Sequence, residues 1–223
     1  MTAPELRHFT IRRRVRYATI DVEPDAVRQV WFALHGYSQL AHRFLRHLAA
    51  IDDGSRRIVA PEGLHRHYID HAERKVGASW MTSEDRLTDI EDYVAYLDAL
   101  HGQVLADLPR PVPVIGLGFS QGVHTLCRWI AFGKARIDRA ILWGGTVPPD
   151  LDLDGPGAAL AGADLQLVVG TEDEYFGATA VRAHEDRLAS AGIPFRSRSF
   201  SGGHRLDGPL LEELAEIGPG AER

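Results

Sequence analysis

The residues best suited to chemistry lie at the end of an apolar run, where Ser120 stands between Gly118 and Gly122. Residues 112 to 117 supply the continuous apolar run of a buried parallel strand, and residues 123 to 132 can form the helix that follows at once. Glycines two positions before and after the serine are required, because side chains there would collide with the neighbouring strand and helix. Such a turn would expose the hydroxyl and point the first N–H groups of the helix at whatever Ser120 attacks. The pattern predicts a serine nucleophile, although by itself it also fits a glycine-rich strand-helix joint with a bystander serine.

A serine nucleophile needs an imidazole to take its proton, and the imidazole needs a carboxylate to fix its tautomer and stabilise its cation. Both groups are present in loops that follow predicted strands: a carboxylate cluster at residues 172 to 174, and His204 after two glycines. In open α/β sheets the reactive loops gather beyond the carboxyl ends of the strands. We therefore expect Ser120, an acid near position 173 and His204 to meet there, in that chain order. His184 is a weaker candidate for the base, because it lies on the apolar face of a predicted helix, where a histidine usually only packs.

Residues 61 to 83 form the longest stretch without a predicted element, and long loops inside compact domains usually carry function. This loop follows a strand, so it should overhang the sheet near Ser120 and line the pocket for an acyl group. The side chains that we expect to form this apolar wall are Leu64, Tyr68, Trp80 and Met81. The alternative for Trp80 is that it anchors the loop to the core.

The same loop contains three histidines, His65, His67 and His71, which could bind a metal ion. No acidic ligand accompanies them at helical spacing, so pocket lining or plain packing is favoured. We expect neither a metal nor any other cofactor.

Strands and helices alternate along the chain, without repeats or a linker. Apolar runs and period-two alternation predict strands at residues 9–17, 27–34, 57–60, 112–117, 138–143, 165–169 and 195–200. Apolar stripes at helical spacing predict helices at residues 40–48, from 82–85 to about 106, 123–132, 178–191 and 209–217. This order predicts an α/β fold: a mostly parallel central sheet of about seven strands with helices on both faces, in a single domain over residues 1 to 223. The arginine-rich first strand is expected at an edge of the sheet.

Composition excludes several classes of protein. A net charge of −6, from 25 basic and 31 acidic residues, argues against a general nucleic-acid binder. The glycines before Ser120 lack the third glycine of a dinucleotide loop, and no Gly-Lys-Ser/Thr follows them. The single cysteine, Cys127, excludes an internal disulfide framework and is expected in the core. The first residues have no apolar core of signal-peptide length and no run could span a membrane, so we expect a cytoplasmic protein without stable membrane insertion.

Four motifs together carry a resemblance to a known family: Leu34-His-Gly36, Gly118-Phe-Ser-Gln-Gly122, Gly170-Thr-Glu-Asp173 and Gly203-His204. Over nearly its whole length the chain resembles the α/β-hydrolase superfamily, and within it the phospholipase/carboxylesterase group that includes acyl-protein thioesterases and lysophospholipases. The resemblance implies a triad of Ser120, Asp173 and His204, because the family pattern Gly-x-x-Asp selects Asp173 from the acidic cluster.

The resemblance also implies that the backbone N–H groups of Tyr37 and Gln121 form the oxyanion hole. Thioesterase-like members commonly carry His-Gly-Leu-Gly-Asp, where this chain has His35-Gly-Tyr-Ser-Gln39. The expected activity is that of a serine carboxylesterase that hydrolyses small-molecule carboxylic esters, with thioesters or lysophospholipids as variants, through an acyl-enzyme. The alternatives are a catalytically idle ligand-binding protein of the same fold, and a dienelactone-hydrolase-like enzyme with serine in place of that family's cysteine.

Overall fold

The computed structural model describes residues 5 to 216 and is built around a seven-stranded sheet with the order β1-β3-β2-β6-β7-β8-β9. Only the edge pair β1·β3 is antiparallel; all other neighbouring strands of this sheet run parallel. The strands are β1 (Tyr17–Ile20), β2 (Gln29–Leu34), β3 (Arg56–Pro61), β6 (Val114–Phe119), β7 (Arg139–Trp143), β8 (Asp164–Gly170) and β9 (Phe195–Phe200). The predicted mostly parallel sheet is confirmed, as is the place of the first strand at its edge.

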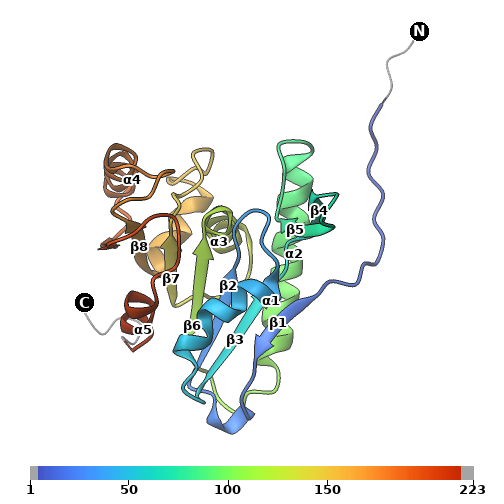
Figure 1. The fold of residues 1–223 in the computed structure, drawn as a ribbon, viewed down its shortest axis with the longest axis horizontal. Coiled ribbons are helices and arrows are strands. Elements are labelled where there is room, and N and C mark those ends of the chain that lie inside the picture. Colours follow the sequence, from blue (N-terminus) through green and yellow to red (C-terminus); the bar gives the residue numbers. More distant parts are fainter. Residues whose placement is uncertain (1–4, 217–223) are drawn as a thin grey trace.

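Helices cover both faces of the sheet, and each face has its own apolar core (Figure 1). On one face lie α2 (Arg86–Leu105), α3 (Gln121–Phe132) and α4 (Ala178–Ser190). On the other lie α1 (Ala41–Phe44), the 3-10 helix Leu45–Ile51 that continues it, and α5 (Gly208–Glu216). Two further 3-10 helices span Pro24–Ala26 and Pro156–Gly162. Within residues 5 to 216, no helix is long and apolar enough to cross a membrane.

The stretch 61 to 83, expected to be irregular, instead contains an antiparallel hairpin of β4 (His65–Asp70) and β5 (Lys75–Ser79). The sequence did not reveal it because β4 reads His-Arg-His-Tyr-Ile-Asp, which has no period-two apolar face. The hairpin lies beside the upper end of α2, away from β1 (Figure 1).

The first strand is shorter than its sequence pattern predicts. Residues 9 to 16 do not belong to the strand, which begins at Tyr17, and Phe9 and Ile11 are 88% and 68% exposed. The reason is the register: Tyr17 already pairs with Pro61, the last residue of β3, so the preceding residues have no strand to bond with. Alternation of side chains describes an extended backbone but not whether a partner is available.

Two helix starts also differ from the prediction. Helix α2 begins at Arg86, and its N-cap residue, Asp85, makes no side-chain capping bond, so the expected start at 82–85 is wrong by a few residues. The helix predicted at 40–48 begins at Ala41, after the N-cap residue Leu40, while Ser38 has a left-handed backbone (φ 59°) and its hydroxyl lies 2.9 Å from His67 Nε2.

Candidate active site

Ser120 lies on the sharp turn between β6 and α3, with φ 53° and ψ −117°. Its backbone N–H donates to the carbonyl of Trp143 in β7 (2.9 Å), which fixes the turn against the sheet. A Cβ atom added at Gly118 would lie 2.5 Å from the Gly122 carbonyl oxygen, and one at Gly122 would lie 2.1 Å from the Leu34 carbonyl oxygen. Both glycines are therefore required by close backbone contacts, as the strand-turn-helix interpretation of the sequence expects.

Asp173 and His204 meet beyond the carboxyl ends of β8 and β9. The Oδ2 atom of Asp173 lies 2.8 Å from Nδ1 of His204. The other oxygen of the carboxylate accepts the backbone N–H groups of Tyr175 (2.9 Å) and Phe176 (3.1 Å). Because an ionised carboxylate only accepts hydrogen bonds, Nδ1 of His204 carries the proton and Nε2 is left as the basic nitrogen.

The two glutamates that flank this aspartate are placed differently. Glu172 and Glu174 are exposed, whereas Asp173 is buried. Of these three carboxylates, Asp173 is the one bonded to His204.

Aromatic rings surround the His204 imidazole. Phe119 lies 4.9 Å from it between ring centroids, Tyr175 lies 4.8 Å away edge-on, and Phe176 stacks at 6.1 Å. Since Phe119 directly precedes Ser120, these contacts hold the imidazole beside the serine turn. No hydrogen bond joins Ser120 Oγ to His204 within residues 5 to 216.

The backbone N–H groups of Tyr37 and Gln121 lie beside Ser120 and have no acceptor in the described part of the chain. Gln121 is the first residue of α3, where backbone N–H groups lack a partner within the helix. The turn that carries Tyr37 touches the serine, because a Cβ added at Gly36 would lie 3.2 Å from Ser120 Cβ.

This turn is held by the hairpin and by His35. Ser38 N–H donates to the Ala78 carbonyl (2.8 Å) and Ala78 N–H to the Gln39 carbonyl (3.1 Å), so the turn pairs with β5. Buried His35 accepts the Gly63 N–H at Nε2 (3.0 Å), and its Nδ1 lies 2.8 Å from the Gly36 carbonyl. Burial lowers the pKa of His35, which keeps the ring neutral, as this bonding pattern requires.

Comparisons with protein families and with curated proteins found no match. Solved structures do match over most of the chain. Esterase PE8 superposes with a TM-score of 0.68 at 19% identity, covering 91% of this chain and 97% of that one. The acyl-protein thioesterase 2 of Zea mays gives 0.67 at 17% (90% and 96% covered), and a carboxylesterase from Mesorhizobium loti gives 0.68 at 18% (91% and 95%).

The chain has the α/β-hydrolase fold. At these identities the likeness establishes the fold, with esterases and a thioesterase among the structures that share it.

Within this hydrolase fold, the residues expected to line the acyl pocket mostly pack inward. Trp80 is fully buried, donates its indole N–H to the His35 carbonyl (2.8 Å) and packs on the His35 and Tyr93 rings. Leu64 and Met81 are partly buried against the same core. Burial of Trp80 favours the anchor interpretation over the pocket one, because a side chain without exposed surface cannot contact substrate. Tyr68 is 48% exposed on the hairpin.

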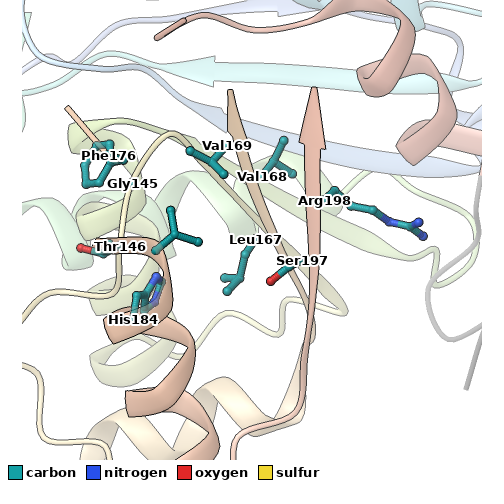
Figure 2. Close-up of a pocket in the computed structure, with 10 residues that line it drawn as sticks. Gly145, Thr146, Leu167, Val168, Val169, Phe176, His184, Ser197 and Arg198 are labelled. Atoms are coloured by element: carbon teal, nitrogen blue, oxygen red, sulfur yellow. The ribbon is translucent and has the colours of Figure 1, made fainter. Parts of the chain in front are cut away.

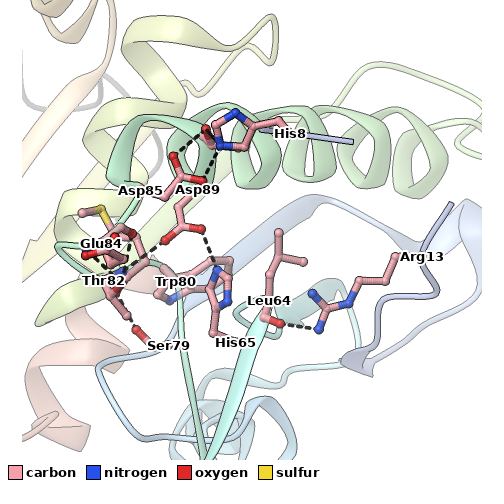
Figure 3. Close-up of polar contacts among 12 residues, drawn as sticks. His8, Arg13, Leu64, His65, Ser79, Trp80, Thr82, Glu84, Asp85 and Asp89 are labelled. Atoms are coloured by element: carbon pink, nitrogen blue, oxygen red, sulfur yellow. Dashed lines mark hydrogen bonds and ion pairs between the residues drawn. The ribbon is translucent and has the colours of Figure 1, made fainter. Parts of the chain in front are cut away.

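The three histidines of the hairpin region each have a partner of their own. Figure 3 shows His65 beside Asp89, with 2.9 Å between Nε2 and Oδ1. His67 Nε2 lies 2.9 Å from Ser38 Oγ, and the His71 ring lies 5.0 Å from that of Tyr68. Across residues 5 to 216, no three or more His, Cys, Asp or Glu side chains are grouped so as to hold a metal ion.

Cys127 and His184 occupy the core positions that the sequence indicates. Burial raises the pKa of the Cys127 thiol to about 12, so it stays protonated and unreactive. His184 is buried on α4 and accepts the Val147 N–H at Nε2 (3.1 Å), which is a packing role.

Sequence reasoning missed two residues of the site, Tyr175 and Phe176, and for Gln121 it predicted the backbone N–H but not the side-chain contacts. The Gln121 side chain binds the main chain at Trp80 and Met81, a contact between distant residues that has no local signal. Tyr175 and Phe176 pack on His204, and their position directly after the predicted acid is a signal that could have found them.

Proposed function

We propose that residues 1 to 223 form a single-domain serine carboxylesterase that hydrolyses small-molecule carboxylic esters through an acyl-enzyme. The observation that carries the proposal is the Asp173–His204 pair, packed beside a serine held in a strained strand-to-helix turn. The esterases among the structural neighbours support the same reaction class. Thioesters and lysophospholipids would react by the same acyl transfer.

In the proposed mechanism, Ser120 Oγ attacks the ester carbonyl carbon while His204 Nε2 takes its proton. Asp173 stabilises the imidazolium that forms and holds it in the correct orientation. The N–H groups of Tyr37 and Gln121 bind the negative oxygen of the tetrahedral intermediate. As this intermediate collapses, His204 gives the proton to the leaving alcohol. Water then attacks the acyl-enzyme with His204 again acting as base, which releases the acid and restores Ser120.

The test is covalent labelling with a fluorophosphonate, followed by mass spectrometry of the intact protein and of its peptides. We expect one added phosphonyl group per chain, located on Ser120, and no labelling of Ser120→Ala. His204→Ala should be labelled far more slowly, because the serine then lacks its base. A folded wild-type protein that is not labelled at Ser120 would refute the proposal and favour an idle ligand-binding protein.

A further inference from the structure

A small cavity lies between α4 and the sheet, on the side where β7 and β8 end (Figure 2). Figure 2 shows His184 reaching it from α4, Leu167 from β8 and Phe176 from the loop after the acid Asp173. Val181 of α4 also lines it, as does Gly145, which follows β7. None of these residues belongs to the hairpin from which the sequence predicts the acyl pocket.

Two walls of this cavity are in direct contact with the proposed triad. Phe176 donates its backbone N–H to Asp173 Oδ1 (3.1 Å), and its ring stacks on His204. Gly145 lies against the serine turn, because a Cβ added there would be 3.0 Å from the Ser120 carbonyl oxygen. The cavity is therefore adjacent to both the nucleophile and the base.

The cavity walls suit a small uncharged group. Leu167, Val181 and Phe176 provide apolar surface. Ser197 and Arg198 of β9 also line the cavity, but Figure 2 shows the Arg198 side chain pointing away from His184 and Leu167. His184 adds no charge, because burial lowers its pKa to about 4 and its Nε2 is occupied by the Val147 N–H. The volume is about 30 Å³, and one water-sized probe needs about 10 to 15 Å³ on this measure, so the space matches one or two methyl-sized groups.

We propose that this cavity, bounded by Leu167, Phe176 and Val181, is the acyl pocket, and that the substrates are esters of short uncharged acids of acetyl to propionyl size. This inference rests on the proposed esterase function. Adjacency to Ser120 and His204 gives the pocket its role, and its volume sets the acyl length. The absence of a side chain at Gly145 lets this wall of the cavity pack directly against Val123 and the Ser120 carbonyl, because a Cβ there would lie 2.7 Å from Val123 Cγ2 and 3.0 Å from the Ser120 oxygen.

The experiment measures kcat/KM for 4-nitrophenyl acetate, propionate, butyrate and hexanoate. For the wild-type protein, kcat/KM should be highest for acetate or propionate and at least tenfold lower for hexanoate. Val181→Ala removes two methyl groups from the wall and should raise the hexanoate-to-acetate ratio at least tenfold. Val181→Leu adds one carbon to the wall and should lower kcat/KM for propionate more than kcat/KM for acetate.

Two matched variants test whether the acyl preference is set by the cavity or elsewhere in the chain. Val15→Ala makes the same chemical change on the exposed segment before β1 and should leave the ratio unchanged. Leu64→Ala tests the competing hairpin wall. A change in the ratio with Leu64→Ala but not with Val181→Ala, in proteins of unchanged melting temperature, would overturn the proposal, as would a wild-type preference for hexanoate.

Failure of this inference can be distinguished from failure of the esterase proposal. A small methyl fluorophosphonate reports the reactivity of Ser120 without needing an acyl pocket. Labelling of Ser120 together with an acyl ranking that Val181 variants do not alter would refute the pocket alone. Lack of labelling in folded protein would refute the esterase function itself.

Discussion

The side-chain amide of Gln121 is bonded to the main chain on either side of the Trp80–Met81 peptide: Oε1 accepts the Trp80 N–H (3.2 Å) and Nε2 donates to the Met81 carbonyl (3.1 Å). The residue after the nucleophile is thereby tied to the end of the hairpin. Trp80 in turn bonds the His35 carbonyl, at the start of the turn that carries Tyr37. The two N–H groups proposed for the oxyanion hole are thus held in one connected network.

Gln121→Glu should lower kcat about tenfold to a hundredfold at pH 8, with a much smaller change in KM. The carboxylate can still accept from Trp80 but cannot donate to Met81, and its charge opposes a developing oxyanion. At lower pH a protonated carboxyl can donate again, so the ratio of variant to wild-type kcat should rise. Steady-state kinetics from pH 5.5 to 8 measure this ratio. A constant ratio across that range would contradict the positioning role, because a purely structural defect would not depend on this proton.

Ser120→Ala should lower kcat by about 10⁴- to 10⁶-fold, with His204→Ala similar and Asp173→Asn milder. Ser120→Ala removes the proposed nucleophile, His204→Ala removes its base, and Asp173→Asn removes the carboxylate that orients the base. Turnover of 4-nitrophenyl acetate by protein free of contaminating esterase is the measurement. If Ser120→Ala kept more than about a tenth of wild-type turnover, the mechanism would be wrong.

Trp80→Ala should lower the free energy of unfolding by about 3 to 5 kcal/mol, because it leaves a cavity in the core. We expect kcat/KM to fall by a similar factor for every ester, because the indole does not face the substrate. Denaturant unfolding and the same acyl series measure both effects. Tyr68→Ala is the matched control: this aromatic residue on the same hairpin is half exposed, so stability should change little. A changed order of acyl preference with little loss of stability would contradict the anchor role and show that Trp80 lines the pocket.

Stability should fall as the pH decreases from about 6.5, the usual pKa of histidine in an unfolded chain, towards 4. Burial lowers the pKa of both His124 and His184 to about 4 in the folded protein. Between pH 4 and 6.5 the two histidines bind more protons in the unfolded state than in the folded state. Their neutral forms therefore stabilise the folded protein fully above the unfolded pKa, and this contribution is lost as the pH falls. Each histidine contributes a slope of up to about 1.4 kcal/mol per pH unit in this window.

His184→Gln removes one of these titrations while an amide oxygen remains available to the Val147 N–H. Urea unfolding of this variant at several pH values should therefore show a shallower dependence than wild type between pH 4 and 6.5. If the free energy of unfolding depends on pH in the same way in both proteins, His184 does not cause the loss of stability at low pH.

The sequence predicted the parts of the fold that local pattern determines. Buried parallel strands are continuous apolar runs, and the chain order of strand-end loops brought Asp173 and His204 to one edge of the sheet. The hairpin was not predicted because β4 carries few apolar residues. The predicted strand at residues 9 to 16 is absent because strand pairing depends on where β3 ends. Gln121 bonds a segment about 40 residues away, a relationship that only the folded chain creates.

The backbone of Ser120 has a conformation that glycine adopts freely and that costs other residues about 1 to 3 kcal/mol. Ser120→Gly should consequently melt at a higher temperature than both wild type and Ser120→Ala, which keeps the strain. Loss of the hydroxyl and gain of stability then coincide in one substitution. Under the proposed mechanism, the substitution that relieves the backbone strain at this position is also one that removes the nucleophile, so stability and activity place opposite demands on residue 120.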